Sequence, residues 1–453
     1  MRLLSGLLNR MVQKGTLRLY DVRGQLHIYG GGPQGPSVTA RIHDPNLYSS
    51  LLFNPELVIG EAYMDGSITF EDDTGIHDLL HLFAVNGEGL AAHPGHRIMR
   101  GVWQATRRLQ QRNPLKKAAA NAAHHYDIGA DLYRLFLDKD LNYSCAFFED
   151  PQNDTLERAQ HNKLRRMAAK LQLRPGMRVA DIGCGWGSAA LFLARNYGVH
   201  VTGISPAGQQ IEVAQARARS ARLTSRLDFR QCDYRELEGS YDRIVSIGMM
   251  EHVGAGYFDT FFSTVRERLT PEGFAFIHCI GRMSPPGVTA PFMRKYIFPG
   301  GYVPALSEVF AATERQRLWV ADMEVLRLHY YYTLRHWRQR FTARRAEAAA
   351  LHGERFCRMW EFYLSAAELG FLHGTNMVFQ ILVSPRADAV PIQRDYMSDD
   401  ARAPLAPPVR KSGGAKARKS AGTQAKKLLK RAAARKAGGK AERAAAKLSG
   451  KTR

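Results

Sequence analysis

The chain has 453 residues, enough for two or three domains that each bury a sizeable core. Its net charge of +22 is uneven, because residues 410–453 carry +15 and the other 409 residues carry only +7. Five cysteines without a C-x-x-C pair, and the absence of a run of 18 apolar residues, argue against a metal site, a disulfide framework or a membrane span.

The sequence pattern of residues 1–120 predicts a small α+β accessory domain followed by a linker. One face of a helix at the start is apolar, and its residues are Leu3, Leu4, Leu7, Leu8 and Met11. Strand patterns follow at residues 16–20, 25–29 and 37–42, and a helical pattern at residues 76–85. The basic stretch 97–117 predicts a helical connector that is either solvated or turned toward a membrane. The first ten residues lack the apolar core of a secretion signal, so we expect a cytoplasmic protein.

The most informative segment is a strand, a glycine-rich turn and a helix in succession. An apolar run, residues 177–180, ends at Asp181, and a helical pattern begins at Ser188. Three glycines stand at alternating positions between them: Gly183, Gly185 and Gly187. Glycine is favoured here because a Cβ would block the approach of a nucleotide-like ligand to the backbone. We therefore expect this segment to line a cofactor site.

The strands that follow narrow the kind of cofactor. The second strand, residues 199–203, runs into Ser205 without the carboxylate that a dinucleotide site places on the ribose. The third strand ends at Asp233, and the fourth, residues 241–248, runs into Glu251. Polar residues at the carboxyl ends of parallel strands indicate a site at that edge of a sheet. The pattern resembles the S-adenosylmethionine-binding fold rather than a nicotinamide-binding one.

The rest of residues 121–390 is predicted to complete this catalytic domain. The expected elements are a helix at 257–269, a turn at 270–273, a strand at 274–280, an insertion at 282–307, helices at 327–345 and 355–369, and a strand at 377–383. We expect the insertion and the two helices to cap the site and the last strand to close the sheet.

Six segments of the catalytic domain occur together in one order, and they are residues 143–146, 181–187, 246–254, 278–281, 295–301 and 329–334. In this order the chain resembles the cyclopropane-fatty-acyl-phospholipid synthases, closely over residues 121–385 and loosely over residues 1–385. The resemblance implies an α/β, Rossmann-like class I S-adenosylmethionine methyltransferase domain beside the N-terminal α+β domain. It also implies transfer of a methylene group to the cis double bond of unsaturated phospholipid acyl chains, at the inner face of the membrane.

Two alternative functions stay open at this point. One is methylation of a lipid alkene, or of another acceptor, without ring closure. The other is a nucleic-acid-associated protein with an inactive methyltransferase core. In the first case the site of the base should be degraded, and in the second the cofactor turn should be lost.

The resemblance implies a bound bicarbonate as the base. Its expected contacts are Glu251, His278, Tyr330 and the backbone of Cys145 and Ile280. Taken without the resemblance, Glu251 could cap a helix N-terminus, His278 could be a satisfied core histidine, and Tyr330 could be core packing. Relatives in the mycolic-acid branch carry a cysteine where this chain has Ala367, so a thiol-based mechanism is not expected.

The resemblance also implies which residues contact each part of the cofactor. Tyr143 and Ser144 should meet the amino-acid end, Ser205 and Gln210 the ribose, and Asp233 and Tyr234 the adenine, while Asp181, Gly183, Gly185 and Gly187 line the turn. Four aromatic residues could face a cationic intermediate or be ordinary core: Phe147, Phe148, Tyr296 and Trp337.

Residues 391–453 are predicted to be a disordered tail rich in Lys and Ala. Between residues 410 and 453, sixteen Lys or Arg stand against one acid, Glu442. Such a segment could bind anionic lipid head groups, bind nucleic acid through counterion release, or simply be solvated. For the N-terminal domain we expect lipid contacts or a homodimer contact.

Overall fold

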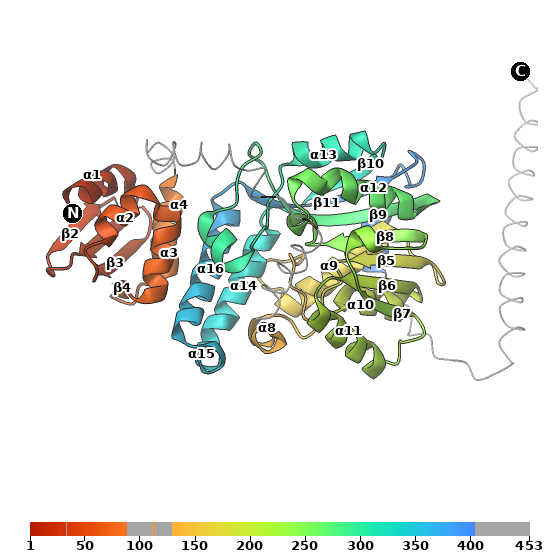
Figure 1. The fold of residues 1–453 in the computed structure, drawn as a ribbon, viewed down its shortest axis with the longest axis horizontal. Coiled ribbons are helices and arrows are strands. Elements are labelled where there is room, and N and C mark those ends of the chain that lie inside the picture. The colour runs from red at the N-terminus through yellow and green to blue at the C-terminus, as the bar shows by residue number, and fades with distance from the viewer. Residues whose placement is uncertain (33, 88–110, 112–113, 115–128, 404–453) are drawn as a thin grey trace, which may run out of the picture. The chain divides into compact units, whose positions relative to one another are not determined.

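The computed structural model describes residues 1–32, 34–87, 111, 114 and 129–403 (Figure 1). Most of the expected basic connector, residues 97–117, and most of the predicted tail, from residue 404 on, lie outside the described residues. Among the described residues, none of the helices combines the length and the apolar character needed to cross a membrane.

The N-terminal part is a four-stranded sheet with helices, as predicted. The sheet order is β2-β1-β3-β4, and its strands are β1 (Thr16–Tyr20), β2 (Leu26–Gly30), β3 (Ser37–Ile42) and β4 (Ile68–Glu71). The helices are α1 (Arg2–Met11), α2 (Leu47–Phe53), α3 (Pro55–Asp65) and α4 (Ile76–Val85). One detail of α1 is corrected: Leu3 is 78% exposed, because the buried stripe runs through Leu4, Leu8 and Met11.

The catalytic domain is built on a seven-stranded sheet of order β10-β11-β9-β8-β5-β6-β7. The strands are β5 (Arg178–Ile182), β6 (His200–Ser205), β7 (Leu227–Gln231), β8 (Tyr241–Ile247), β9 (Leu269–Arg282), β10 (Trp319–Val325) and β11 (Asn376–Ser384). Strands β5 to β9 pair in parallel, and β11 pairs antiparallel with both β9 and β10. The carboxyl ends of β5 to β8 therefore meet at one edge, as predicted.

Two expectations about this sheet were wrong. The last strand, β11, does not close the sheet, because β10 lies outside it and forms the edge. The turn expected at residues 270–273 is instead part of β9, where the pairing with β8 shifts register between Tyr241 and Arg243.

Helices cover both faces of this sheet (Figure 1). Apolar residues of α9 (Leu156–Leu171), α10 (Ser188–Tyr197) and α11 (Gly208–Ser220) form one buried cluster with one face. Residues of α12 (Phe258–Arg268) and α13 (Leu306–Arg315) form another with the opposite face. Along β9, Phe276 belongs to the first cluster and Ile277 to the second, as the two-residue period of a strand requires.

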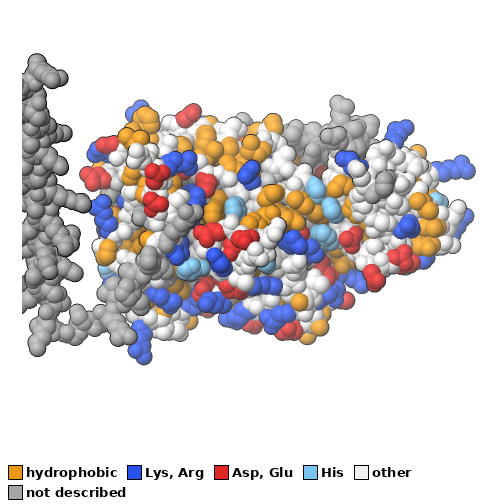
Figure 2. All heavy atoms as spheres, turned by 180° about the vertical axis from the view of Figure 1, so that it is seen from behind, with side chains coloured by type: hydrophobic (Ala, Val, Ile, Leu, Met, Phe, Trp, Pro, Cys, Tyr) orange, Lys and Arg blue, Asp and Glu red, His pale blue; other side chains and the backbone are white. Residues whose placement is uncertain are grey.

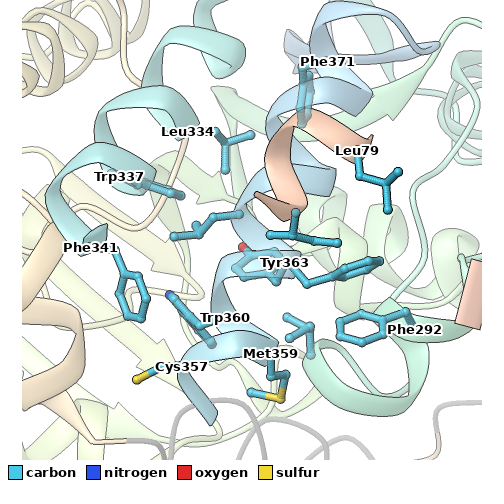
Figure 3. Packing of buried hydrophobic residues seen from close by; sticks show 14 of the residues in the cluster. Leu79, Phe292, Leu334, Trp337, Phe341, Cys357, Met359, Trp360, Tyr363 and Phe371 are labelled. Atoms are coloured by element: carbon cyan, nitrogen blue, oxygen red, sulfur yellow. The ribbon is translucent and has the colours of Figure 1, made fainter. Parts of the chain in front are cut away.

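A further helical layer packs against the N-terminal domain and the site. It consists of α8 (Ala130–Phe136), α14 (His329–Ala343), α15 (Arg345–His352) and α16 (Glu354–Leu372). Figure 3 shows Leu334 and Trp337 of α14 directed toward Tyr363 and Trp360 of α16. On its other side α16 contacts α3 and α4, so it joins the N-terminal domain to the site.

The predicted start of the tail at residue 391 was too early. Helix α17 (Tyr396–Arg402) contacts α9, and Met397 is buried. Just before this helix, Arg394 forms an ion pair with Asp322 at 2.6 Å. The compact body accordingly includes α17, close to the last described residue, 403.

Candidate active site

A pocket opens at the carboxyl ends of β5, β6 and β8, at the glycine-rich turn. Gly183 and Gly185 have positive φ values of 84° and 53°, which favour glycine. A Cβ added at Gly185 would find only Gln210 Nε2, at 4.0 Å, so this position leaves room for a ligand. At Gly183, a Cβ would instead lie 2.9 Å from the side chain of Met249.

Gly187 does not line this pocket, contrary to the expectation. A Cβ at Gly187 would lie 2.8 Å from the ring of Phe229 and 3.0 Å from Ala214. The glycine is therefore required by the packing of α10 against the neighbouring strand and helix. Its φ of 80° at the N-terminus of α10 is a second reason.

The other nine residues expected at the cofactor line the same pocket: Tyr143, Ser144, Asp181, Gly183, Gly185, Ser205, Gln210, Asp233 and Tyr234. Ser205 Oγ lies 2.9 Å from Gln210 Oε1 and donates to it. This contact holds the amide of Gln210 beside the turn, because its Nε2 is the atom nearest to Gly185. The ribose role of this pair stays a prediction.

The expected adenine contacts have partners within the protein. Asp233 accepts from the guanidinium of Arg235 at 2.7 and 2.9 Å. Tyr234 is 4% exposed and packs edge-on against Phe261. Both residues line the pocket, and their contacts to an adenine stay a prediction.

Asp181 lines the pocket and carries an unsatisfied carboxylate oxygen. Its side chain is buried, and Oδ2 has no hydrogen-bond partner among the described residues. Burial raises the pKa of Asp181 to about 7. A cationic ligand group beside it would offset this desolvation.

Lys163, on α9, is a pocket residue that sequence reasoning missed. Its Nζ donates to Ser144 Oγ at 2.9 Å and to Asn142 Oδ1 at 3.2 Å. Asn142 in turn donates to Asp138 at 2.7 and 2.8 Å. Burial lowers the pKa of Lys163 to about 8. A single lysine within a helical run carries no motif, so only the fold reveals it.

A second cavity, of about 420 Å³, adjoins the first. Tyr143, Ser144, Gly248 and His252 line both. All five residues expected at the base line this second cavity: Cys145, Glu251, His278, Ile280 and Tyr330. The structure therefore brings together segments that lie up to 185 positions apart in the chain.

Glu251 follows β8 on a short 3₁₀ helix, Met250–His252. Its Oε1 accepts from the backbone N–H of Ile280 at 2.6 Å, and its Oε2 has no hydrogen-bond partner among the described residues. Burial raises the pKa of Glu251 to about 7. The N–H of Ile280, which the resemblance assigned to bicarbonate, is thus engaged by Glu251 here.

His278 lies on β9 next to the end of β8 and is held from the adjacent strand. Gln380, on β11, donates its side-chain N–H to His278 Nδ1 at 3.1 Å. Lys170 donates to the oxygen of the same amide at 2.8 Å, which fixes the amide orientation. Burial lowers the pKa of His278 to about 3, so the ring is neutral. With Nδ1 accepting, the proton lies on Nε2.

Tyr330 and Cys145 also line the second cavity. Tyr330 packs against Phe371 and Trp337, with ring centroids 4.7 and 5.8 Å away. Cys145 is fully buried, and burial raises the pKa of its thiol well above the usual range. A thiolate nucleophile is therefore disfavoured at this position.

The four aromatic residues that could either face a cation or be ordinary core do not line either of these two cavities, which favours the core alternative. Phe147 stacks on His329, and Tyr296 donates to Glu61 on α3. The aromatic residues that do line the second cavity come from the insertion and from α14 and α16: Phe298, Tyr302, Tyr330, Tyr363 and Phe371, together with Tyr143. Tyr143 and Tyr363 hydrogen-bond through their hydroxyls at 2.7 Å.

A third cavity, of about 270 Å³, is lined almost entirely by apolar side chains. Its walls come from the N-terminal domain, the insertion and α16. Four residues line both this cavity and the second one: Glu56, Ala290, Met293 and Ala366. The third cavity and the cavity around Glu251 thus share part of their walls.

Comparisons with known proteins show which family this chain resembles. Residues 113–381 match the family described as "Mycolic acid cyclopropane synthetase". The chain is 36% identical to the cyclopropane-fatty-acyl-phospholipid synthase of Escherichia coli (strain K12), over 80% of this chain and 91% of that protein. It is 33% identical to cyclopropane mycolic acid synthase 1 of Mycobacterium tuberculosis (strain H37Rv), over 55% of this chain and 92% of that protein.

Among solved structures, the chain is similar to the mycolic acid cyclopropane synthase CmaA1 complexed with SAH and CTAB. The TM-score is 0.56 and the identity 31%, over 58% of this chain and 97% of that one.

Proposed function

This chain belongs to the mycolic acid cyclopropane synthetase family, and from that premise we propose that it converts cis double bonds of phospholipid acyl chains into cyclopropane rings. It is an S-adenosylmethionine-dependent methyltransferase. The observation that carries the proposal is the contact between two cavities: the pocket at the glycine-rich turn adjoins a second cavity that holds an unsatisfied buried carboxylate, Glu251.

The residues of the first pocket fit S-adenosylmethionine. Gly185 leaves space for a ligand beside the backbone, and Asp181 Oδ2 has no hydrogen-bond partner among the described residues. A cationic group of the ligand would pair with this oxygen. S-adenosylmethionine supplies an electrophilic methyl group on a sulfonium. Tyr143 and Ser144 line both cavities, which supports a position of the cofactor's amino-acid end, and of the sulfonium next to it, where the two cavities meet.

The residues of the second cavity fit a small anion that carries an acidic hydrogen. Glu251 Oε2 is an unsatisfied acceptor, and His278 is neutral with its proton on Nε2, a donor. One acceptor and one donor in one cavity suit bicarbonate, whose hydroxyl donates and whose oxygens accept. Bicarbonate would supply the proton acceptor of the reaction.

The reaction needs a dry, oriented site because an isolated alkene is a weak nucleophile. The alkene forms a carbon–carbon bond to the methyl group as the carbon–sulfur bond breaks, which leaves a carbocation on the acyl chain. The new methyl group then loses a proton to the base, and the electron pair of that C–H bond closes the ring. Glu251 and His278 hold the base in place, and the aromatic wall excludes water.

The acyl chain extends through the third cavity in this proposal. The apolar lining of that cavity, and the four residues that it shares with the second, support such a path. The N-terminal domain would then hold one part of the lipid while the double bond lies beside Glu251.

Lipid analysis of cells that express the chain tests the function. We expect unsaturated acyl chains to gain the mass of one CH₂, and proton NMR of the extracted lipids to show cyclopropane ring hydrogens. The NMR arm is essential, because methylenation without ring closure gives the same mass. Loss of both signals in Glu251→Ala supports the role of Glu251. An unchanged lipid profile with methylation of a polar metabolite would show the proposal to be wrong.

Association with the inner face of the membrane rests on the charge of residues 410–453. On the face of the body shown in Figure 2, Lys and Arg side chains are interspersed with Asp and Glu. The tail, by contrast, carries +15, and each basic residue near an anionic bilayer contributes about 1 kcal/mol.

Cosedimentation with vesicles containing phosphatidylglycerol, compared with duplex DNA, separates the two candidate partners of the tail. We expect vesicle binding to fall when the chain ends at residue 403. Equal binding of the shortened chain would exclude the tail as the membrane contact, and preferential DNA binding would favour nucleic acid. Sedimentation analysis of the full chain tests the expected homodimer.

A further inference from the structure

We propose that Lys163 receives the α-carboxylate of S-adenosylmethionine, beside Ser144, which the resemblance already assigns to the amino-acid end, and opposite an α-ammonium held at Asp181. This inference rests on the proposed function, because it assigns contacts to the same cofactor. It gives a role to a buried cation that none of the sequence motifs includes. The pocket would then recognise the zwitterionic amino-acid end of the cofactor by charge.

Lys163 is buried without an anionic partner in direct contact. Its side chain lies among the most buried of the chain, with 2% of the residue exposed, yet it lines the cofactor pocket. Its two acceptors, Ser144 Oγ and Asn142 Oδ1, are both neutral, and no carboxylate of the described residues lies within 4.0 Å of its Nζ. Desolvating an ammonium is costly unless an anion faces it.

Ser144 strengthens the same site. Its oxygen accepts from Lys163, so its hydroxyl hydrogen is left to donate to another acceptor. A carboxylate in front of Ser144 would accept one hydrogen bond from this hydroxyl and one from Lys163. Because Ser144 also lines the second cavity, this end of the cofactor would lie close to the reacting end.

The charge pattern of the pocket matches a zwitterion. Asp181 Oδ2 is buried and without a partner among the described residues, and the carboxylate lines the same pocket as Lys163. Lys163 and Asp181 do not form an ion pair within 4.0 Å, so neither satisfies the other directly. The pocket therefore contains one buried cation, Lys163, and one buried carboxylate, Asp181, and neither has an oppositely charged partner in direct contact.

Lys170 provides an internal comparison. It lies seven residues further along α9, about two turns, and is 1% exposed. Unlike Lys163, it has a carboxylate partner, Glu324, at 2.6 Å, and it lies outside the cofactor pocket. The same helix thus carries one lysine that is neutralised by the protein and one that faces the pocket.

Calorimetric binding of two ligands to the full chain tests the proposal. The first ligand is S-adenosylhomocysteine, and the second is its analogue that lacks only the carboxylate. We expect the wild type to prefer S-adenosylhomocysteine by about tenfold to a hundredfold, since charge-assisted hydrogen bonds to a buried carboxylate are lost with the analogue. Lys163→Met should reduce this preference to near one while leaving the affinity for the analogue within about threefold of wild type.

Three further variants sharpen the test. Lys163→Arg should restore part of the preference, because it keeps the charge. Asp181→Asn should weaken both ligands, because both retain the ammonium, and should keep the preference between them. Arg158→Met, on the exposed side of the same helix and outside the cofactor pocket, should leave the preference as in the wild type.

The outcomes separate the two proposals. Binding of S-adenosylhomocysteine together with an unchanged preference in Lys163→Met would overturn the role of Lys163 alone. Failure of the wild type to bind S-adenosylhomocysteine would overturn both that role and the proposed function. In the variants that leave Asp181 unchanged, the affinity for the analogue reports whether the pocket is still folded.

Discussion

Gln380 donates its side-chain N–H to His278 Nδ1 across two adjacent strands, at 3.1 Å. The orientation of this amide is set by Lys170, which donates to Gln380 Oε1 at 2.8 Å and is itself paired with Glu324 at 2.6 Å. Glu324 thus holds Lys170, Lys170 orients the amide of Gln380, and this amide keeps the proton of His278 on Nε2. Gln380 is therefore a positioning residue, which acts through His278.

Gln380→Glu should lower kcat/KM by about a hundredfold or more, because a carboxylate accepts where the amide donates and so reverses the tautomer of His278. Nitrogen NMR of the labelled His278 ring should show the proton moved to Nδ1. Affinity for S-adenosylhomocysteine, which we propose to bind in the other cavity, should be unchanged and serves as the control. If the variant had a reversed tautomer and wild-type activity, the reaction would not need His278 as a hydrogen-bond donor.

The pH dependence of activity should follow Glu251. The pKa of Glu251 is raised to about 7 and that of His278 lowered to about 3, both by burial. The ionised carboxylate accepts the hydroxyl of the bound base, so kcat should rise with pH through about 7, while His278 stays neutral throughout.

The measurement uses saturating S-adenosylmethionine, so that Asp181 and Lys163 are covered by ligand. Bicarbonate must be held at one concentration at every pH, since its own protonation would otherwise shape the profile. A kcat that is flat between pH 6 and 8 would contradict the role of an ionised Glu251.

Glu251→Gln should stabilise the fold at alkaline pH while it abolishes activity. The pKa of Glu251 is about 7 in the folded state against an ordinary value of 4.5, so the folded state binds the proton more tightly than the unfolded one. The free energy of unfolding of the wild type therefore decreases, through this group, as pH rises from about 4.5 to 7. The cost reaches about 3 kcal/mol above pH 7.

Denaturant unfolding of wild type and Glu251→Gln at pH 5 and pH 8 measures this effect. The stability advantage of the variant should be larger at pH 8 than at pH 5. An advantage that is independent of pH would mean that Glu251 does not titrate in this range.

The sequence predicted the site where local patterns meet strand ends. Asp181 and Glu251 follow apolar runs and Asp233 follows an alternating strand pattern, and parallel strands bring such ends to one edge of a sheet. Edge strand β10 was missed, because three of its seven residues are exposed in succession and no alternation marks it.

Lys163 and Gln380 could not be found in this way. Each is one polar residue in a helix or strand pattern, and its role depends on partners that only the fold brings near, such as Ser144 and His278. The aromatic residues around the second cavity could not be identified from the sequence for a related reason. Sequence proximity to a motif suggested Phe147, whereas Tyr363 reaches the cavity from α16.

The passage between the second and third cavities can be narrowed at Ala366 on α16. This small side chain lines both cavities, and a phenyl ring in its place would project into the space that they share. Ala366→Phe should therefore lower turnover of lipids whose acyl chain extends far beyond the double bond more than that of lipids with a short extension. We expect the ratio of kcat/KM for long over short chains to fall about tenfold, since a few displaced methylenes account for such a factor.

Ala366→Ser, which adds no bulk comparable to a ring, should keep the wild-type ratio and controls for the loss of alanine itself. Competition between two lipids in mixed vesicles measures the ratio directly, because differences in total activity cancel. If Ala366→Phe slowed both lipids equally, the acyl chain would not pass this point. The apolar cavity of the N-terminal domain would then serve the packing of that domain rather than the substrate.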